Sequence, residues 1–89
     1  MYYIYVLKSK KDLGWYIGLT NNLEGRLKDH NFGKTRSTKS RRPLEIIYSE
    51  KFQNKIEVES AEKYYKSGAG RIKLKELIKK KLKLINNEL

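Results

Sequence analysis

The sequence predicts a small α/β fold of the α+β type, in which a three-stranded antiparallel sheet is flanked by helices in the order β-β-α-β-α-α. Two strand-like runs near the N-terminus are separated by a short turn-like segment. A third strand-like run lies in the middle of the chain, and the remainder carries apolar residues at helical spacing. A chain of 89 residues is expected to form a single domain over residues 1–89.

The first two strands are expected at residues 2–7 and 15–20, which are rich in aromatic and β-branched residues. Residues 9–14 between them carry Lys, Asp and Gly, which are typical of a turn. The two strands are therefore expected to pair as an antiparallel hairpin. Because side chains alternate along a strand, Ile4 lies on one face of the first strand and Tyr5 on the other.

Two tyrosines of this hairpin can lie on the same face of the sheet. Tyr5 and Tyr16 share a face if the connecting loop has an even number of residues. A four-residue loop at residues 9–12 would place them directly opposite each other. Gly18 shares the face of Tyr16, because side chains two apart in a strand point the same way.

The middle of the chain predicts a helix, a loop and the third strand. Asn21 or Asn22 is a good N-cap for a helix over residues 23–32. Residues 33–42 are polar and basic and contain no acidic residue, so they are expected to form a loop. The third strand is expected at residues 44–52, where Leu, Ile and Tyr recur.

The C-terminal part predicts two further helices. Asn54 is a good N-cap for a helix over residues 56–66. Gly68 and Gly70 are expected to interrupt the chain before a last helix over residues 71–84. Apolar residues recur at helical spacing in this last helix, at Leu74, Leu77, Ile78, Leu82 and Ile85.

Composition limits the partners and the chemistry. The chain carries 21 Lys and Arg against 10 Asp and Glu, a net charge of +11. An excess of this size on a small domain favours a polyanionic partner, of which nucleic acid is the obvious candidate, although basicity can also serve solubility alone. No cysteine and only one histidine are present, which excludes cysteine nucleophiles and zinc sites of thiolates or several histidines. Any metal is expected to be a hard cation held by carboxylate oxygen and water.

The same composition bears on location. The absence of cysteine fits the reducing cytoplasm. No apolar run approaches the ~20 residues that span a bilayer, so no membrane partner is expected. The chain opens directly with a strand-like run, which predicts no signal peptide.

Glu62 has an informative position in the second helix. It lies four residues after Val58, within the stripe that Val58, Ala61 and Tyr65 form. A carboxylate on the core-facing side of a helix is costly unless it has a partner. The partner is a metal ion, an Arg or Lys side chain, or water at the edge of the stripe, and periodicity alone does not choose between these.

Arg26 and His30 lie four residues apart on the first helix and are therefore neighbours. The guanidinium of Arg26 can clamp a phosphate, or it can cover apolar surface with its stem. His30 is either a reactive group or a packed histidine, and Tyr5 and Tyr16 are either functional or core tyrosines. The argument for function is that the strand face and both helices can meet on one side of a small sheet.

Cations alternate with hydroxyl side chains in the loop at residues 33–42. This pattern suits a phosphate backbone, and such contacts position a nucleic acid without reading its sequence. A solvated loop is the alternative, and the lysine-rich last helix, with Lys73 and Lys75, is likewise either a second phosphate track or a solvated face. The cations of the loop are Lys34, Arg36, Lys39, Arg41 and Arg42.

The tyrosines, the arginine, the histidine and the glutamate together resemble the GIY-YIG nuclease family, and above all its small single-domain bacterial members. Tyr5 ends the first motif, and Tyr16-Ile17-Gly18 matches the second. Arg26 follows ten residues after Tyr16, and His30 four residues later. The segment 57–63 resembles the family's glutamate helix. The first motif begins with Tyr3 rather than glycine, and the segment 67–71 departs from the small members.

The resemblance implies a metal-dependent endonuclease that hydrolyses phosphodiester bonds in DNA, with branched, damaged or single-stranded forms as candidate substrates. It implies one divalent ion, Mg²⁺ or Mn²⁺, on Glu62. It further implies that Arg26 stabilises the phosphate, and that Tyr16 or Tyr5 orients the attacking water with help from His30. The alternative is a non-catalytic nucleic-acid-binding module of the same fold. An unidentified partner is a further candidate for targeting, since no second domain is expected.

Overall fold

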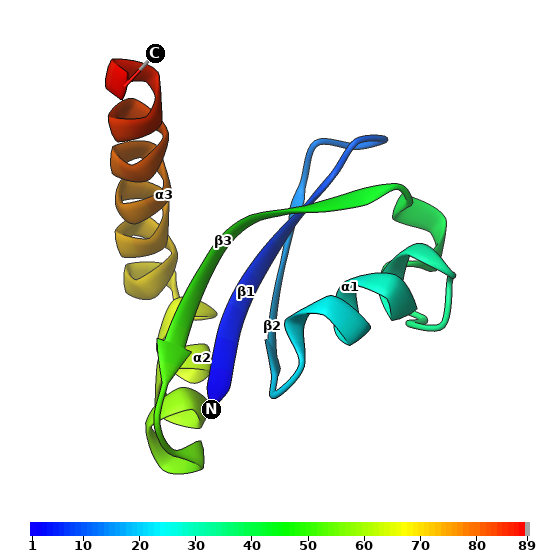
Figure 1. The fold of residues 1–89 in the computed structure, drawn as a ribbon, viewed down its shortest axis with the longest axis horizontal. Helices are drawn as coiled ribbons and strands as arrows, with labels where there is room; N and C mark the ends of the chain where they lie inside the picture. The colour runs from blue at the N-terminus through cyan, green and yellow to red at the C-terminus, as the bar shows by residue number, and fades with distance from the viewer. Residues whose placement is uncertain (89) are drawn as a thin grey trace.

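The computed structural model describes the backbone of residues 1–88 and the side chains of residues 1–83. Three antiparallel strands form one sheet in the order β2-β1-β3. Three α-helices and one short 3₁₀ helix complete the chain (Figure 1). The elements are β1 (Tyr2–Ser9), β2 (Trp15–Thr20), α1 (Leu23–Asn31), η1 (Lys39–Arg41), β3 (Leu44–Phe52), α2 (Lys55–Tyr65) and α3 (Gly68–Glu88). The predicted fold class and element order are confirmed.

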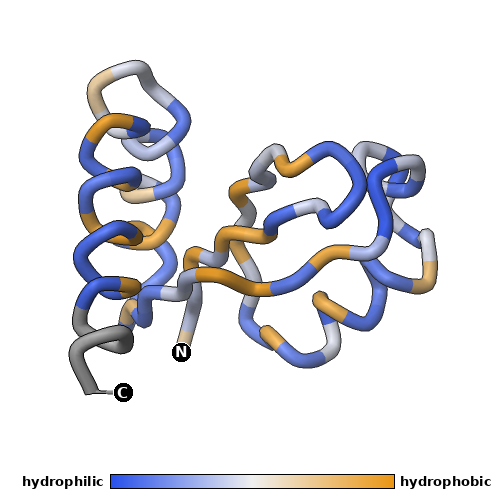
Figure 2. The backbone as a smooth tube through the Cα atoms, turned by 90° about the horizontal axis from the view of Figure 1, so that it is seen from above, coloured by the Kyte–Doolittle hydropathy of each residue, from blue (hydrophilic) through white to orange (hydrophobic). Residues whose placement is uncertain are grey.

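The sheet has a helical layer on each side, with α1 on one side and α2 and α3 on the other (Figure 1). On the second side, Ile4 and Val6 of β1 pack against Val58 of α2 and against Leu74 and Ile78 of α3, all of them buried. The smaller apolar cluster on the α1 side is formed by Tyr5, Leu7 and Leu44 with Tyr16, Leu23, Leu27 and Ile46 around them. Figure 2 shows the hydrophobic residues on the strands, and alternating with hydrophilic ones along α3.

Helix starts are set by side chains that the sequence singles out. The Asn22 side chain accepts a hydrogen bond from the backbone N–H of Gly25, and the Asn54 side chain accepts one from that of Glu57. Each bond satisfies a donor that the first helical turn leaves unpaired. The predicted caps are therefore confirmed, with Asn22 and not Asn21 as the cap of α1, and α1 and α2 lie within one residue of their expected bounds.

The predicted turn at residues 9–14 is confirmed, whereas the four-residue loop at 9–12 that would place Tyr5 opposite Tyr16 does not form. The last pair of the hairpin is Lys8 with Trp15, so that an even number of residues, 9–14, connects them. The turn is wider because the buried Ser9 hydroxyl accepts hydrogen bonds from the backbone N–H groups of Lys11 and Asp12. Tyr5 and Tyr16 share a face as predicted, but they are diagonal neighbours and not directly opposite.

The two glycines after α2 do not interrupt the chain, which corrects the expectation of a break at Gly68 and Gly70. Helix α3 begins at Gly68 and contains both. A Cβ atom on Gly70 would lie 1.7 Å from the carbonyl oxygen of Tyr64, so only glycine lets the first turn of α3 approach the last turn of α2. The Ser67 hydroxyl accepts a hydrogen bond from the Gly70 N–H and so marks the start of the helix.

Helix α3 carries the predicted apolar stripe only in part. Leu74 and Ile78 are buried, Leu77 is half-buried, and Leu82 is 52% exposed. The side chain of Ile85, the last predicted member, lies outside those described. No helix within residues 1–88 combines the length and the apolar character needed to cross a membrane.

Candidate active site

Tyr5 occupies the centre of the sheet on the side that α1 covers. It pairs across the hairpin with Gly18, and a Cβ atom on Gly18 would lie 2.3 Å from the phenolic oxygen and the Cζ atom of Tyr5. Because Gly18 has no side chain, the Tyr5 ring can occupy the space beside it. The ring is consequently only 2% exposed, although it carries a polar hydroxyl.

A chain of hydrogen bonds runs from Arg26 through this hydroxyl into the protein. The Nε–H of Arg26 donates to the phenolic oxygen of Tyr5 over 3.2 Å. That oxygen lies 3.0 Å from Nε2 of His30, and Nδ1 of His30 lies 2.7 Å from the hydroxyl of Thr38. The Thr38 hydroxyl in turn lies 3.5 Å from the carbonyl oxygen of Thr35.

The last of these contacts, at 3.5 Å, favours one direction of donation along the whole chain. A carbonyl oxygen can only accept, so the Thr38 hydroxyl donates to Thr35 and accepts from Nδ1–H of His30. Nε2 of His30 then carries no proton and accepts from the Tyr5 hydroxyl, while the Tyr5 oxygen accepts from Arg26. We call Arg26, Tyr5, His30 and Thr38 the polar chain.

Burial keeps the inner members of the polar chain uncharged. Burial raises the pKa of the Tyr5 phenol, and the hydrogen bond from Arg26 opposes that rise only in part. Burial also lowers the pKa of His30, and the positive charge of Arg26 adds to this effect. At neutral pH Tyr5 is therefore a phenol and His30 a neutral imidazole. The hydrogen bond to Tyr5 raises the pKa of Arg26, which remains a cation.

Solvent reaches Arg26 of the polar chain and the neighbouring Tyr16. Both are half-buried, whereas Tyr5, His30 and Thr38 are buried. The ring of Tyr16 packs edge-on against His30 with ring centroids 4.9 Å apart, and its centroid lies 6.3 Å from that of Tyr5. Tyr16 and Arg26 are therefore accessible from outside, while the buried groups pack against Tyr16 and hydrogen-bond to Arg26.

The structure brings together four of the five predicted catalytic residues, and it places Glu62 on α2. The side chain of Glu62 is 28% exposed, and its carboxylate lies 3.5 Å from Nζ of Lys66 one turn later. After burial, which is the main cause, the negative charge of Glu62 is one of the smaller influences that raise the pKa of Tyr5. Among the described residues no hydrogen bond joins Glu62 to the polar chain. Glu62 therefore lies within electrostatic reach of the phenol without contacting it.

Glu62 is also the residue that the sequence predicts as the ligand of a divalent ion. Within residues 1–83 no three Asp, Glu or His side chains gather into a ready-made metal cage. A single half-buried carboxylate fits Mg²⁺ or Mn²⁺, because Mg²⁺ keeps several waters and is commonly held by one or two carboxylates together with substrate phosphate. The donor set therefore suits an ion that arrives hydrated, and does not suit an ion that needs several protein ligands.

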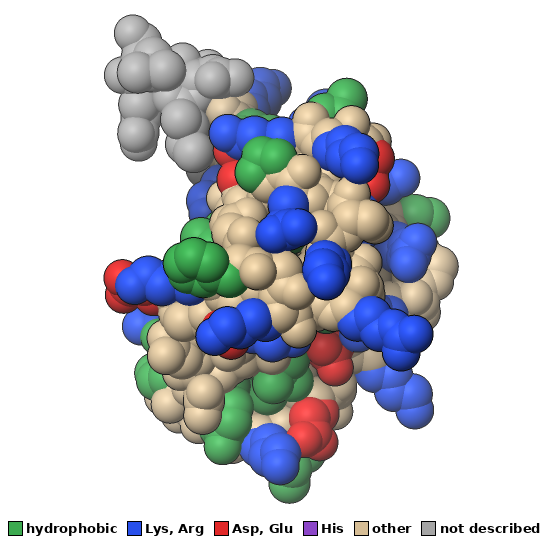
Figure 3. Space-filling view, turned by 90° about the vertical axis from the view of Figure 1, so that its right-hand side faces the viewer, with side chains coloured by type: hydrophobic (Ala, Val, Ile, Leu, Met, Phe, Trp, Pro, Cys, Tyr) green, Lys and Arg blue, Asp and Glu red, His purple; other side chains and the backbone are tan. Residues whose placement is uncertain are grey.

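The basic loop between α1 and β3 differs from a row of free cations. Arg36 and Lys39 are exposed, and Figure 3 shows Lys and Arg side chains spread over the face that carries α1 and this loop. Lys34 lies 3.8 Å from Asp29, and both groups are exposed. The Arg42 guanidinium donates to the carbonyl oxygen of Lys39.

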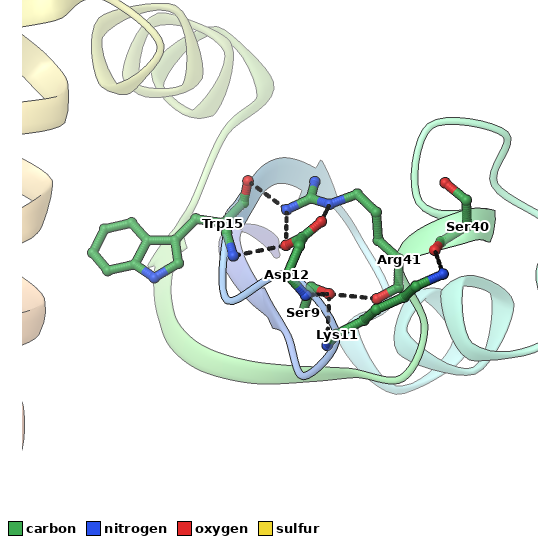
Figure 4. A network of polar contacts seen from close by, with 7 residues as sticks. Ser9, Lys11, Asp12, Trp15, Ser40 and Arg41 are labelled. Atoms are coloured by element: carbon green, nitrogen blue, oxygen red, sulfur yellow. Dashed lines mark hydrogen bonds and ion pairs between the residues drawn. The ribbon is translucent and has the colours of Figure 1, made fainter.

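Arg41 is turned inward, and it fastens the loop to the tip of the hairpin (Figure 4). Its guanidinium donates to both carboxylate oxygens of Asp12, over 2.7 and 3.3 Å, and contacts the carbonyl oxygen of Trp15 at 3.5 Å. The Ser9 hydroxyl donates to the carbonyl oxygen of Arg41 over 2.6 Å. Arg41 therefore holds the segment that carries Thr38, and its side chain is less available to a ligand than the sequence pattern suggests.

Two residues of this region, Thr38 and Asp12, were not singled out by the sequence as members of the site. Thr38 lies in a run of polar residues where one hydroxyl resembles the next, and only its contact with His30 distinguishes it. Asp12 lies in a turn, where aspartate is common. Its partner Arg41 is 29 residues away, so no local spacing links the two.

Comparisons with known proteins show which proteins the chain is similar to. The family model described as the GIY-YIG catalytic domain matches residues 1–76. A UPF0213 protein of Clostridium perfringens is 43% identical over 89 residues, which cover 99% of this chain and 95% of that protein. UPF0213 protein YazA of Bacillus subtilis is 48% identical over 66 residues, which cover 73% of this chain and 66% of that protein.

A solved structure shows the same arrangement of elements. The solution NMR structure of a UPF0213 protein from Bacillus halodurans matches with a TM-score of 0.54 and 32% identity. The match covers 86% of this chain and 85% of that chain. Together with the family model, it assigns the chain a nuclease-type fold.

Proposed function

This chain belongs to the GIY-YIG family, a family of endonucleases, and from that membership we propose that it hydrolyses phosphodiester bonds in DNA with a divalent ion. The observation that carries the proposal is the polar chain, which holds a cationic Arg26 beside a solvent-accessible Tyr16. A guanidinium fixed in this way is suited to a phosphate, because it presents planar donors to two oxygens at once.

Arg26 is proposed to stabilise the phosphate as negative charge builds on it. Its Nε–H is taken by Tyr5, so a phosphate would be met by the terminal nitrogens. The guanidinium does not have to reorganise when the charge develops, because the Tyr5 hydroxyl already fixes its plane. Preorganised donors of this kind account for a large part of the rate enhancement of many enzymes.

Tyr16 is proposed to orient the attacking water, because it is the tyrosine that solvent reaches. Tyr5 is buried and its hydroxyl has two partners, so its proposed role is to position Arg26 and not to contact the water. His30 and Thr38 support Tyr5 in turn. The raised pKa of Tyr5 argues against a phenolate at this position at neutral pH.

Glu62 is proposed to bind one Mg²⁺ or Mn²⁺ together with water. When bound, the ion would supply positive charge to the phosphate and to the leaving oxygen. Lys66 has to release the carboxylate of Glu62 for this, since the two are paired at 3.5 Å. A solvent-accessible pair of this kind contributes only about 0–1 kcal/mol, so its loss is a small obstacle.

The basic loop is proposed to contact the DNA backbone, chiefly through Arg36 and Lys39, which are exposed. Lys34 and Arg42 are exposed as well and would add to the positive charge that attracts the DNA. Arg41 would support DNA binding indirectly, by holding the loop against the hairpin. The proposed place of action is the cytoplasm. The same surface leaves room for a partner that directs the domain to branched, damaged or single-stranded DNA.

Cleavage assays with paired glutamate variants test the proposal. Purified protein with Mg²⁺ or Mn²⁺ is expected to nick a panel of labelled DNA substrates, and Glu62→Gln or Arg26→Ala is expected to lower the rate by about 100- to 1,000-fold. DNA binding by both variants is expected to remain close to that of the wild type. Glu59→Gln is the matched control, because Glu59 is also paired with a lysine four residues away on α2, and it is expected to cleave normally.

The outcomes of these assays distinguish an endonuclease from a non-catalytic module of the same fold. Full cleavage by both Glu62→Gln and Arg26→Ala would rule out the proposed site. Binding without cleavage on every substrate and with every metal would instead indicate the alternative, a non-catalytic nucleic-acid-binding module.

A further inference from the structure

A cavity of about 560 Å³ lies between the hairpin and the junction of α2 with α3. Residues 13–17 of the hairpin form one wall, and Lys66, Arg71 and Lys75 belong to the opposite wall. Its volume falls within the range of about 300–1,000 Å³ that is typical of sites for small organic ligands. None of the sequence patterns discussed above predicts this cavity.

The two walls of the cavity differ in chemistry. The hairpin wall contains Trp15, whose ring points away from the Arg41 network toward the helices (Figure 4). The helical wall contributes three cations, and no Asp or Glu is among the described residues that line the cavity. Arg71 and Lys75 are four residues apart on α3 and therefore share a face. An aromatic surface opposite several cations suits a ligand with a flat ring and a phosphate.

The cavity borders both parts of the candidate active site through one lining residue each. Tyr16 lines the cavity and also packs against His30 of the polar chain. On the other wall, Lys66 lines the cavity and pairs with Glu62. A chain of nucleotides whose scissile phosphate lies at Arg26 and Glu62 would therefore place a neighbouring nucleotide in or near this cavity.

We propose that the cavity binds one unpaired nucleotide of the substrate strand. Its base stacks on Trp15, and its phosphate contacts Arg71, Lys75 and Lys66. In a duplex both faces of a base are covered by the neighbouring bases, so only an unpaired base can present a face to the tryptophan. The location of this site beside the scissile bond rests on the proposed function, but the binding itself does not.

Trp15 provides a direct readout, because it is the only tryptophan in the chain. The wild-type protein is titrated in EDTA, where no divalent ion supports cleavage, with an unpaired oligothymidine, with a duplex of equal length and with thymidine monophosphate. We expect saturable quenching of the tryptophan fluorescence by the oligothymidine, and little quenching by the duplex. Equal quenching by the duplex, or none by the oligothymidine, would overturn the proposal. The free nucleotide tells whether the cavity recognises a single nucleotide or needs the strand.

Substitutions distinguish binding in this cavity from non-specific binding of DNA by the basic surface. Arg71→Ala and Lys75→Ala are each expected to weaken binding of the oligothymidine severalfold and to make its dependence on salt less steep. Trp15→Ala is expected to weaken it about tenfold, measured by the anisotropy of a labelled oligothymidine. Trp15 also packs against the core, so the two exposed α3 variants keep the test independent of folding. Lys63→Ala, an exposed lysine of α2 outside the cavity, is the control and is expected to bind normally.

The two proposals fail in different ways. If the oligothymidine quenches Trp15 and no substrate is cleaved, the nucleotide site stands and the proposed endonuclease function falls. If DNA is cleaved but neither quenching nor the effects of Arg71→Ala and Lys75→Ala are seen, the endonuclease function stands and the nucleotide site falls.

Discussion

The two faces of the sheet are built from the same central strand, yet they are assembled by different forces. On the side of α2 and α3, Ile4 and Val6 pack on Leu74 in an apolar core. On the side of α1, Tyr5 and His30 are just as buried but are held by directed hydrogen bonds. An apolar face tolerates many combinations of residues of the right size, whereas a buried polar group is costly unless its partner is in place. The first face therefore provides stability, and the second provides a site of fixed geometry.

The largest loss of stability is expected when a buried side chain is removed from the apolar face. Leu74→Ala removes a fully buried side chain and is expected to lower the free energy of unfolding by about 2–5 kcal/mol. Urea unfolding followed by circular dichroism measures this value. Ile72→Ala on the same helix is the control, since Ile72 is 64% exposed, and it is expected to change stability by less than about 0.5 kcal/mol. Equal losses in the two variants would contradict the assignment of this face as the core.

A smaller change in stability with a clear change in activity is expected on the polar face. Tyr5→Phe keeps the ring but removes the hydroxyl that Arg26 and His30 share. The buried Nε2 of His30 then lacks a partner, which costs about 1–3 kcal/mol. Cleavage is expected to fall as well, because the plane of the Arg26 guanidinium is no longer fixed. Tyr48→Phe is the control for cleavage. It removes a hydroxyl that donates to Glu50 on the other side of the sheet, where α2 and α3 pack. Normal cleavage by Tyr5→Phe would contradict the positioning role.

The smallest change in stability is expected at the edge of the polar face, where Asp12 pairs with Arg41. The hydrogen bond from Arg41 is the main cause that lowers the pKa of Asp12 from 3.8 to about 2. A carboxyl whose pKa is lowered in the folded state stabilises that state above its ordinary pKa, and this contribution is lost as the pH falls from 3.8 through about 2. Asp12→Asn is therefore expected to be less stable than the wild type at neutral pH, and to lose less stability over this acidic range.

Urea unfolding at a series of pH values from 5 downward measures this difference. Asp29→Asn is the matched control, because Asp29 pairs with Lys34 at 3.8 Å where both side chains are exposed. In this variant the pair of Asp12 with Arg41 is intact, so the loss of stability between pH 3.8 and about 2 is expected to remain. An unchanged acid dependence in Asp12→Asn would show that the pair does not hold the hairpin to the loop.

The apolar face could be predicted from the sequence because its signals are local. Alternation assigned Ile4 and Tyr5 to opposite faces, and Asn22 and Asn54 marked the helix starts. The segment 68–70 shows the limit of such signals. Glycine usually weakens a helix, but at Gly70 it serves a close contact with Tyr64 that only the packed structure reveals.

The polar face could be predicted only as a set of residue types. Arg26 and His30 were found by their helical spacing, and Tyr5 and Tyr16 by their strands. The pairing of Tyr5 with Gly18 depends on the width of a turn that Ser9 builds through its side chain. The contact of His30 with Thr38 depends on a loop whose place is set by long-range bonds, so sequence spacing contains no information about it.

The direction of the polar chain is the claim on which the site depends most. It is tested by the protonation of the His30 ring nitrogens, measured by ¹⁵N NMR on the wild-type protein, in which His30 is the only histidine. The structure predicts a neutral ring at neutral pH, with the proton on Nδ1, a bare Nε2 facing Tyr5, and a pKa below the ordinary 6.5. A proton on Nε2, or a ring that is charged at neutral pH, would contradict the account, because Tyr5 could then no longer donate to His30 while it accepts from Arg26.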